Sequence, residues 1–315
     1  MNAHSTMREK VDAYLVERRR AGFALTIDAR QLARFACFTD ASGYRGTLTI
    51  EIARRWATAS KQGQRLTAAR RIEVLRGFAR YCLSFDPATQ IPPVGLFGSA
   101  HRRLTPHIFA DAEIRALLEA AADLPPRGGL RGATCACVFG LIAATGLRIS
   151  EATSLTRADV DWQQGCLRIR EGKFGKSRWV PLHVTTRDAL HRYAKQRDRD
   201  ALAALSERFF VFDNGRTAST RNLQYAFSIL RRQLGWRARG GHPRPRIHDL
   251  RHTFVSRRLE RWSADNVDIA RNLLALSTYV GHAHVTDTYW YVTATPKLLA
   301  IAARRLDPLV TGRVP

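Results

Sequence analysis

Apolar residues recur at helical spacing through the first part of the chain. In segment 67–85 they fall three or four positions apart, at Ile72, Leu75, Ala79 and Cys82. The other face of this segment is basic and carries Arg70, Arg71 and Arg80. Similar patterns predict helices at 5–20, 29–40 and 49–60, with Asp28 as a cap for the second. The pattern therefore predicts a small all-helical bundle with basic faces.

A segment rich in proline and glycine follows this bundle. Residues 86–106 read DPATQIPPVGLFGSAHRRLTP and contain four prolines, two glycines and an arginine pair. Such a composition is typical of a linker. We therefore divide the chain into a helical domain at 1–95, a linker at 96–106 and a second domain at 107–315.

The second domain shows helical patterns and one hairpin pattern. Helical spacing covers 111–124 and 220–235, and the uncharged run 132–147 suits a buried helix that stops at Gly146. This run is too short for a membrane span. Two alternating runs within 166–182 flank GKFGK and predict a β-hairpin. RFFVF, at 208–212, predicts another short buried strand. TPKLLAIAARRL, at 295–306, reads as a terminal amphipathic helix. We expect a mainly α fold with a small β-sheet.

The charge of the chain points to a polyanionic partner. Lys and Arg total 51 against 27 acidic residues, which gives a net charge of +24 and a pI of about 11.1. An excess of this size favours nucleic acid as the partner, ahead of an anionic membrane. A hydrophobic content of 45% over 315 residues indicates a folded protein with room for two cores. We expect no membrane association.

The cysteines indicate a reducing compartment. The chain has five, an odd number, with no CxxC spacing. Four of them lie among apolar residues and are expected to be reduced core thiols, namely Cys37, Cys82, Cys135 and Cys137. The N-terminal sequence MNAHSTMREKVDAYLVERRR has no apolar signal core. We therefore expect a cytoplasmic protein.

The stretch HDLRHTF raises the question of a metal site. His248 and His252 would share one face of a helix, as the two histidines of zinc proteases do. A zinc protease needs glutamate beside the first histidine, but Asp249 stands here, and nothing places a third ligand such as His282 nearby. A metal also leaves the charge unexplained. We expect no metal and no cofactor. His252 and His284 are expected to pack or cap.

A different constellation carries the chemistry. Arg148 lies in TGLRISE, Lys173 in the hairpin turn, His248 and Arg251 in an H-x-x-R pattern, His282 after a glycine, and Tyr291 nine residues later. This set suits attack on a phosphodiester without a metal. Its order, wording and spacing over roughly 107–291 resemble the tyrosine recombinase (phage integrase) family. The resemblance implies a helical SAM-like core-binding domain followed by an α+β catalytic domain.

The resemblance also implies roles for these residues. Arg148 and Arg251 would bind the non-bridging oxygens of the scissile phosphate, as two planar guanidiniums can. Tyr291 would be the nucleophile and form a 3′-phosphotyrosine. His248 would be the base, and His282 would hydrogen-bond the phosphate. Lys173 would be the general acid.

Several assignments around this set are less direct. Lys176 is the alternative to Lys173 as acid, and Tyr289 is expected to pack. Glu151 would orient His248 or Arg148. Residues expected to contact DNA are Arg70, Arg71, Arg102, Arg103, Lys176 and Arg178.

The expected function is site-specific recombination of duplex DNA, for integration, excision or transposition. The partners would be DNA with paired sites and further copies of this chain, as a homotetramer, with the terminal helix either mediating assembly or folding back. Type IB topoisomerases share much of the catalytic set but usually have lysine at the position of His248. A non-catalytic DNA-binding regulator is the other alternative.

Overall fold

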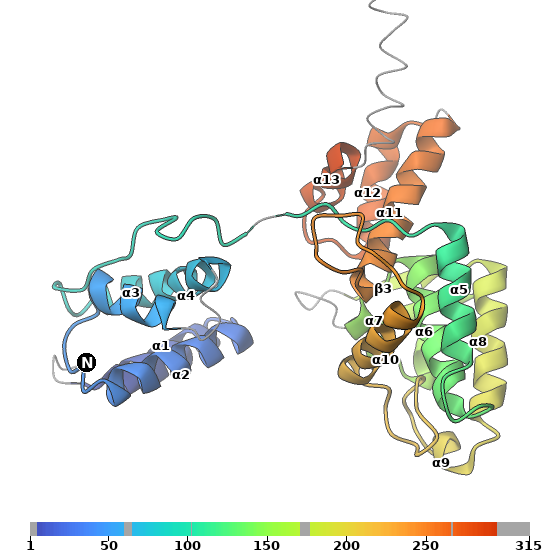
Figure 1. Cartoon of the computed structure of the whole chain (residues 1–315), viewed down its shortest axis with the longest axis horizontal. Coiled ribbons are helices and arrows are strands. Elements are labelled where there is room, and N and C mark those ends of the chain that lie inside the picture. The colour runs from blue at the N-terminus through green and yellow to red at the C-terminus, as the bar shows by residue number, and fades with distance from the viewer. Residues whose placement is uncertain (1–4, 60–64, 102, 171–176, 266, 295–315) are drawn as a thin grey trace, which may run out of the picture. The chain divides into compact units, whose positions relative to one another are not determined.

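The computed structural model describes residues 5–59, 65–101, 103–170, 177–265 and 267–294. The chain divides into two compact units, Met1–Arg103 and Leu104–Pro315 (Figure 1). The division falls between residues 103 and 104, within the range expected for the linker. Each unit has a hydrophobic core of its own.

The N-terminal unit is all-helical. Its four helices are α1 (Met7–Arg20), α2 (Thr26–Ala41), α3 (Ile50–Thr58) and α4 (Arg65–Leu83). A capping box between Thr6 and Glu9 starts α1. The expectation that Asp28 caps α2 is wrong, because α2 begins two residues earlier and Asp28 lies in its first turn. The core of the unit is built around Phe35, Trp56 and Phe78.

Two expectations for this unit need correction. Arg71 does not lie on the outer basic face: its guanidinium sits 4.9 Å from the Trp56 ring centre, and its Nη1 donates to the Trp56 carbonyl at 2.7 Å. Arg71 therefore braces α3 against α4, while Arg70 remains exposed. Cys37, expected in the core, is exposed because it lies on the outer face of α2.

The second unit combines helices with a small antiparallel sheet (Figure 1). The sheet has the order β1-β2-β3 and pairs Leu167 with Val180 in its centre. The elements are α5 (Asp111–Ala122), α6 (Leu130–Thr145), α7 (Ile149–Ser154), the 3-10 turn η1 (Arg157–Asp159), β1 (Val160–Asp161), β2 (Cys166–Ile169), β3 (Arg178–Pro181), α8 (Val184–Arg197), α9 (Ala201–Ala204), α10 (Thr220–Gln233), α11 (Ile247–Ala264), α12 (Ile269–Val280) and α13 (Thr286–Ala294).

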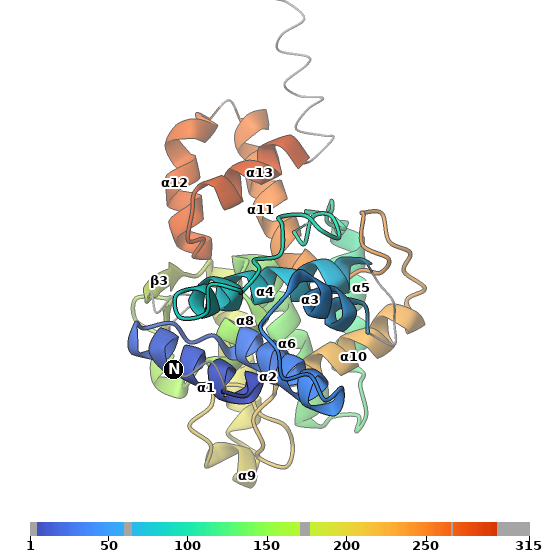
Figure 2. The same ribbon diagram turned by 90° about the vertical axis from the view of Figure 1, so that its left-hand side faces the viewer.

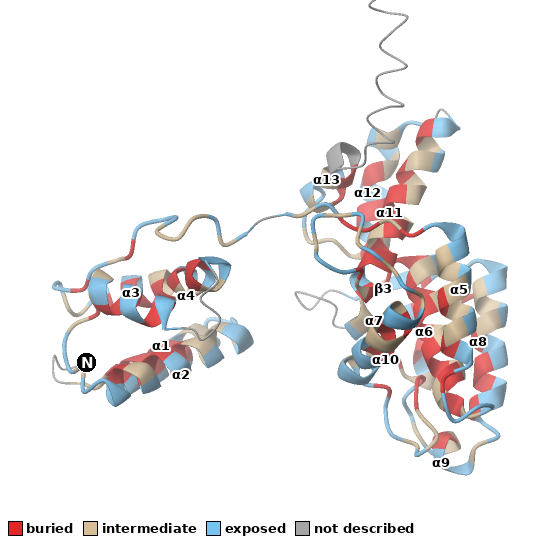
Figure 3. Cartoon of the chain, in the orientation of Figure 1, coloured by how far each residue is buried: buried red, intermediate tan, exposed pale blue. Residues whose placement is uncertain are grey.

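Helix α6 is central to the larger core of this unit. It packs against α5, α8 and α11, and buried residues run along most of its length (Figure 3). The uncharged run therefore forms the buried helix that its pattern predicts. A smaller core joins α11, α12 and α13, which gather at one end of the unit (Figure 2). It contains Val255, Leu259, Leu273, Leu276, Val280 and Tyr291.

One local prediction failed in the second unit. RFFVF is not a strand: Phe209 and Phe210 are buried, but among the described residues the segment makes isolated bridges and pairs with no strand. His282 and His284 lie in the turn between α12 and α13. The hairpin turn at 171–176 and the predicted terminal helix lie outside the described residues. Within the described ranges, no helix is both long and apolar enough to cross a membrane.

Candidate active site

Arg251 is buried where α6 ends. It lies on the first turns of α11, is only 1% exposed, and donates from Nη1 to the carbonyl of Gly146 at 2.7 Å. Gly146 caps α6 with a φ of 68°, a backbone conformation that favours glycine. Nη2 of Arg251 makes no hydrogen bond to the described part of the chain. A buried guanidinium nitrogen without a partner is costly, so this position favours an anion.

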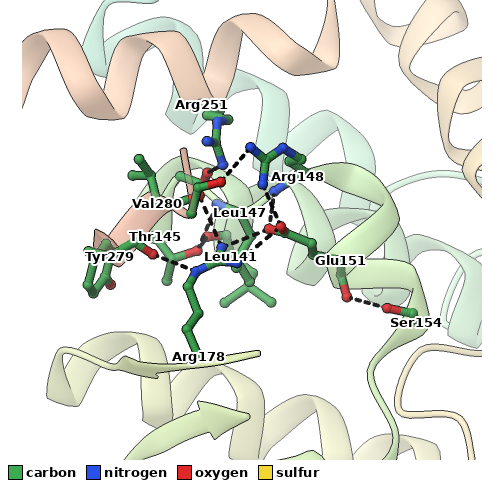
Figure 4. A network of polar contacts seen from close by, with 12 residues as sticks. Leu141, Thr145, Leu147, Arg148, Glu151, Ser154, Arg178, Arg251, Tyr279 and Val280 are labelled. Atoms are coloured by element: carbon green, nitrogen blue, oxygen red, sulfur yellow. Dashed lines mark hydrogen bonds and ion pairs between the residues drawn. The ribbon is translucent and has the colours of Figure 1, made fainter. Parts of the chain in front are cut away.

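Arg148, like Arg251, donates a hydrogen bond to the carbonyl of a glycine that ends a helix. It precedes α7, and its Nη2 donates to the carbonyl of Gly281 at 2.7 Å. Gly281 caps α12 with a φ of 73°. Figure 4 shows Arg148 and Arg251 side by side. Each arginine is thus fixed by the carbonyl of a glycine that ends a helix, and the two guanidiniums concentrate positive charge in one place.

Glu151 lies between Arg148 and Arg178 and contacts both (Figure 4). Glu151 is buried on α7 and accepts from Arg148 Nη1 at 2.7 Å and from Arg178 Nη2 at 2.9 Å. Arg178, at the start of β3, also donates to the carbonyls of Tyr279 at 2.8 Å and Val280 at 3.1 Å. Burial alone would raise the pKa of Glu151, but the hydrogen bonds and charge of Arg178, together with Arg148, lower it below its usual value.

Arg178, expected to contact DNA, makes contacts within the protein in this structure. Its side chain is 11% exposed, and its donors are directed at Glu151 and the end of α12. The sequence shows only a basic residue after the hairpin turn. It does not indicate that Glu151, 27 positions earlier, is the partner of Arg178. Glu151 contacts Arg148, as one of its two expected roles requires.

The first histidine of HDLRHTF begins α11. His248 keeps an exposed edge, and its ring packs edge-on against His252, with ring centres 4.6 Å apart. Asp249 is fully buried and caps the helix by accepting from the backbone nitrogen of Arg246 at 2.7 Å and from its guanidinium at 2.8 Å. Asp249 therefore serves the helix end, which is not the geometry of a general base beside a metal.

His282 and Tyr291 are brought together by α13. His282 Nδ1 hydrogen-bonds the hydroxyl of Thr288 at 2.7 Å, and its ring is nearly parallel to that of Tyr291, with centres 6.2 Å apart. Tyr291 is 3% exposed. Tyr289, expected to pack, is 55% exposed, because residues two apart on a helix point in different directions. The site therefore contains Tyr291 and not Tyr289.

One residue of the site was missed by sequence reasoning. His252 Nδ1 lies 2.5 Å from the hydroxyl oxygen of Tyr291, although His252 was expected only to pack or cap. The available signal was the i, i+4 spacing with His248, which places both rings on one side of α11. That spacing suggested a metal and did not point to a tyrosine 39 positions later.

The electrostatics of the site are strongly positive. Burial, then the charge of Arg148, lowers the pKa of Arg251 to about 10, so the guanidinium remains charged at neutral pH. Burial, then the charge of Arg251, lowers the pKa of His248 to about 4 and that of His282 to about 3. Both histidines are therefore neutral in this state. An anion placed between the arginines would relieve their repulsion.

Other predicted residues lie elsewhere. Lys173, Lys176 and Arg102 fall outside the described residues. Arg70 and Arg103 are exposed residues of the N-terminal unit. The structure thus brings together Arg148, Glu151, His248, Arg251, His282 and Tyr291 in the second unit.

Known proteins share this sequence pattern. The model of the phage integrase family matches residues 108–297, which is more than half of the chain. The chain belongs to this family. An integrase/recombinase called y4rB from Sinorhizobium fredii is 40% identical over 96% of this chain and 98% of its own length. Tyrosine recombinase XerC from Lacticaseibacillus casei is 29% identical over 89% of this chain and 91% of its own.

Solved structures of tyrosine recombinases share the fold. The XerH site-specific recombinase in its post-cleavage complex with difH aligns with a TM-score of 0.64 and 19% identity, over 87% of this chain and 77% of that one. The Tn1549 transposon integrase bound to transposon end DNA aligns with a TM-score of 0.65 and 16% identity, over 95% and 99%. With its family membership, this makes the chain a tyrosine-type site-specific recombinase, and neither the topoisomerase nor the regulator alternative is favoured.

Proposed function

We propose that this recombinase cuts one DNA strand with the hydroxyl of Tyr291, at a phosphate bound between Arg148 and Arg251. The observation that carries the proposal is the buried Nη2 of Arg251, which has no hydrogen-bond partner among the described residues. A phosphate oxygen would supply that partner. It would also screen the repulsion between the two guanidiniums, which are fixed in advance by the carbonyls of Gly146 and Gly281.

The bond changes balance without a cofactor. The Tyr291 oxygen forms a bond to phosphorus and loses its proton, while the bond from phosphorus to the 5′ oxygen breaks. The product is a 3′-phosphotyrosyl bond and a free 5′ hydroxyl, and attack by another 5′ hydroxyl reverses the step. We assign Lys173 as the acid that protonates the leaving oxygen. His248 is our candidate base, and His282 our donor to the phosphate.

The same proposal extends to the DNA and to assembly. The helical domain 1–95 and the catalytic domain 107–315 would both bind duplex DNA, with phosphate contacts from Arg70, Arg102, Arg103 and Lys176. Recombination exchanges strands between two sites, so the active assembly would be a homotetramer on paired sites. The apolar stripe of 295–306 would mediate that assembly. Truncation after Thr295 should then abolish paired-site complexes while single-site DNA binding remains.

The deciding experiment compares two tyrosine variants. Each is incubated with a duplex whose nick lets the cut fragment diffuse away, which traps the covalent adduct. Tyr291→Phe should bind the duplex normally and form no adduct, because only the nucleophilic oxygen is lost. Tyr289→Phe is the matched control and should form adduct as the wild type does. Adduct from Tyr291→Phe, with none from Tyr289→Phe, would show that the other tyrosine is the nucleophile.

A further inference from the structure

The nucleophile is held by a residue with no assigned role in the mechanism above. The Tyr291 hydroxyl lies 2.5 Å from His252 Nδ1, and the centres of the two rings are 5.4 Å apart. His252 directly follows Arg251 on α11, whereas Tyr291 comes from α13. One rigid helix therefore carries both a phosphate-binding arginine and the partner of the nucleophile.

The ring of His252 is fixed on several sides. His248, one helical turn earlier, packs edge-on against it, and Trp290 lies on another side with ring centres 6.2 Å apart. Burial, then the neighbouring His248, lowers the pKa of His252 to about 2. The imidazole is therefore neutral and has one nitrogen that accepts a hydrogen bond. A phenol has a single hydrogen to donate, and Nδ1 can accept it in the tautomer that carries the ring hydrogen on Nε2.

We propose that His252 is a positioning residue for the nucleophile: Nδ1 accepts the phenolic hydrogen of Tyr291 before attack, and that hydrogen leaves for the candidate base, His248, as the bond to phosphorus forms. This direction of the hydrogen keeps it on the His252 side of the oxygen, away from a phosphate held by Arg148 and Arg251. The proposal rests on the proposed function, in which Tyr291 attacks that phosphate. Orientation of this kind matters because a small displacement of a reacting atom lowers the rate by about 100-fold.

Two nearly isosteric variants separate positioning from packing. His252→Asn keeps a side-chain oxygen that can occupy the position of Nδ1 and accept a hydrogen bond. His252→Leu introduces a side chain with as many heavy atoms as that of asparagine but with no hydrogen-bond acceptor. The measurements are the single-turnover rate of adduct formation on the nicked duplex and the affinity for uncleaved DNA. We expect His252→Leu to slow adduct formation by about 10- to 100-fold and His252→Asn to recover most of that loss. DNA affinity should stay within about twofold in both, because neither variant removes a phosphate contact.

The controls distinguish failure of this inference from failure of the proposed function. His284→Leu changes an exposed histidine two residues after His282 and should leave the rate unchanged. Adduct formed by Tyr291→Phe would refute the proposed function, whatever the histidine variants do. A His252→Leu enzyme that cleaves as fast as the wild type, or faster, would refute positioning by His252. An Asn variant as slow as the Leu variant would do the same.

A second measurement does not depend on changing His252. In the wild type labelled with nitrogen-15 histidine, the His252 Nδ1 signal should be that of an unprotonated, hydrogen-bonded nitrogen. Tyr291→Phe removes the donor, so the signal should move toward the value of a free acceptor nitrogen. A protonated Nδ1 in the wild type, or a signal that Tyr291→Phe does not move, would overturn the proposal even if the Leu variant failed to fold.

Discussion

Arg178 and Glu151 form a two-pronged ion pair next to Arg148. Nη1 lies 3.1 Å from Oε1, and Nη2 lies 2.9 Å from Oε2. Arg148 shares the same carboxylate at 2.7 Å. The remaining donors of Arg178 reach the last carbonyls of α12, directly before Gly281 and His282. A single buried guanidinium thus ties together α7, β3 and α12, three segments that are distant in sequence.

Replacing Arg178 by lysine tests whether its contacts hold α7, β3 and α12 together. Arg178→Lys keeps the charge but has no planar fork, so it cannot hold both carboxylate oxygens and the carbonyls of α12 at once. We expect a loss of stability of about 2–4 kcal/mol and a slower cleavage step, since Arg148 loses its fixed partner. Chemical unfolding and single-turnover cleavage measure the two effects. Arg187→Lys is the control, because Arg187 is 41% exposed and pairs only loosely with Asp188. Equal behaviour of the two variants would contradict the role of Arg178.

Gly281 both ends α12 and lies against the side chain of Arg178. Its φ of 73° is unfavourable for other residues, and an added Cβ would lie 2.5 Å from Arg178 Nη1. Gly281→Ala should therefore cost the left-handed penalty of about 1 kcal/mol plus the displacement of Arg178. Gly235→Ala is a matched control, because Gly235 has a φ of 65° and an added Cβ would meet nothing within 4 Å. We expect a larger drop in stability and cleavage for Gly281→Ala. Equal losses would mean that the contact with Arg178 has no effect.

Much of this architecture follows from short-range patterns. The uncharged run ending at Gly146 predicts α6 because both the apolar positions and the terminating glycine are local. The four N-terminal helices follow from the same spacing. Phe209 and Phe210 are buried as expected, but whether their segment forms a strand depends on a neighbour that the segment itself does not specify.

Among the site residues, some could be grouped from the sequence and the contacts of others could not. Arg148, His248, Arg251, His282 and Tyr291 stand at motif positions, so their grouping could be expected from the resemblance. The partners of Arg178 and His252 could not, because each contact joins residues many positions apart and depends on how α7, α11 and α13 pack. The sequence alone suggests that Arg178, a basic residue after a hairpin, contacts DNA, because it does not show the buried carboxylate of Glu151 beside it. A second histidine in a helix reads as packing until the tyrosine beside it is known.

Chelators should leave cleavage unchanged. The phosphate charge is assigned to Arg148 and Arg251, and the carboxylate of Asp249 is committed to the N-terminus of α11. The measurement is the adduct rate on the nicked duplex after exhaustive treatment with EDTA. The untreated enzyme and the treated enzyme with added zinc are the controls. A loss of activity that zinc restores would contradict the assignment and would support a metal at His248 and His252.

Acid should destabilise the DNA-free catalytic domain over the pH range between the folded and unfolded pKa values of its buried histidines. Burial, then nearby positive charge, lowers the pKa of His282 to about 3, and burial lowers that of His252 to about 2, against an ordinary value of 6.5. Below about pH 6.5 the unfolded chain binds protons that the folded chain does not, so stability falls as pH falls toward the folded pKa values. Above that pH these rings contribute no pH dependence.

The window between pH 6.5 and 5 isolates this effect, because the carboxylates with lowered pKa values, such as Glu151, start to matter only near their unfolded pKa of about 4.5. Each ring can contribute up to roughly 1 kcal/mol per pH unit. Urea unfolding at pH 7.5, 6.5 and 5.5 measures the slope. His252→Asn removes one titrating ring and should give a shallower slope than the wild type between pH 6.5 and 5.5, with equal slopes above pH 7. A wild-type stability that stays constant down to pH 5 would mean that these imidazoles are protonated as readily in the folded chain as in the unfolded one.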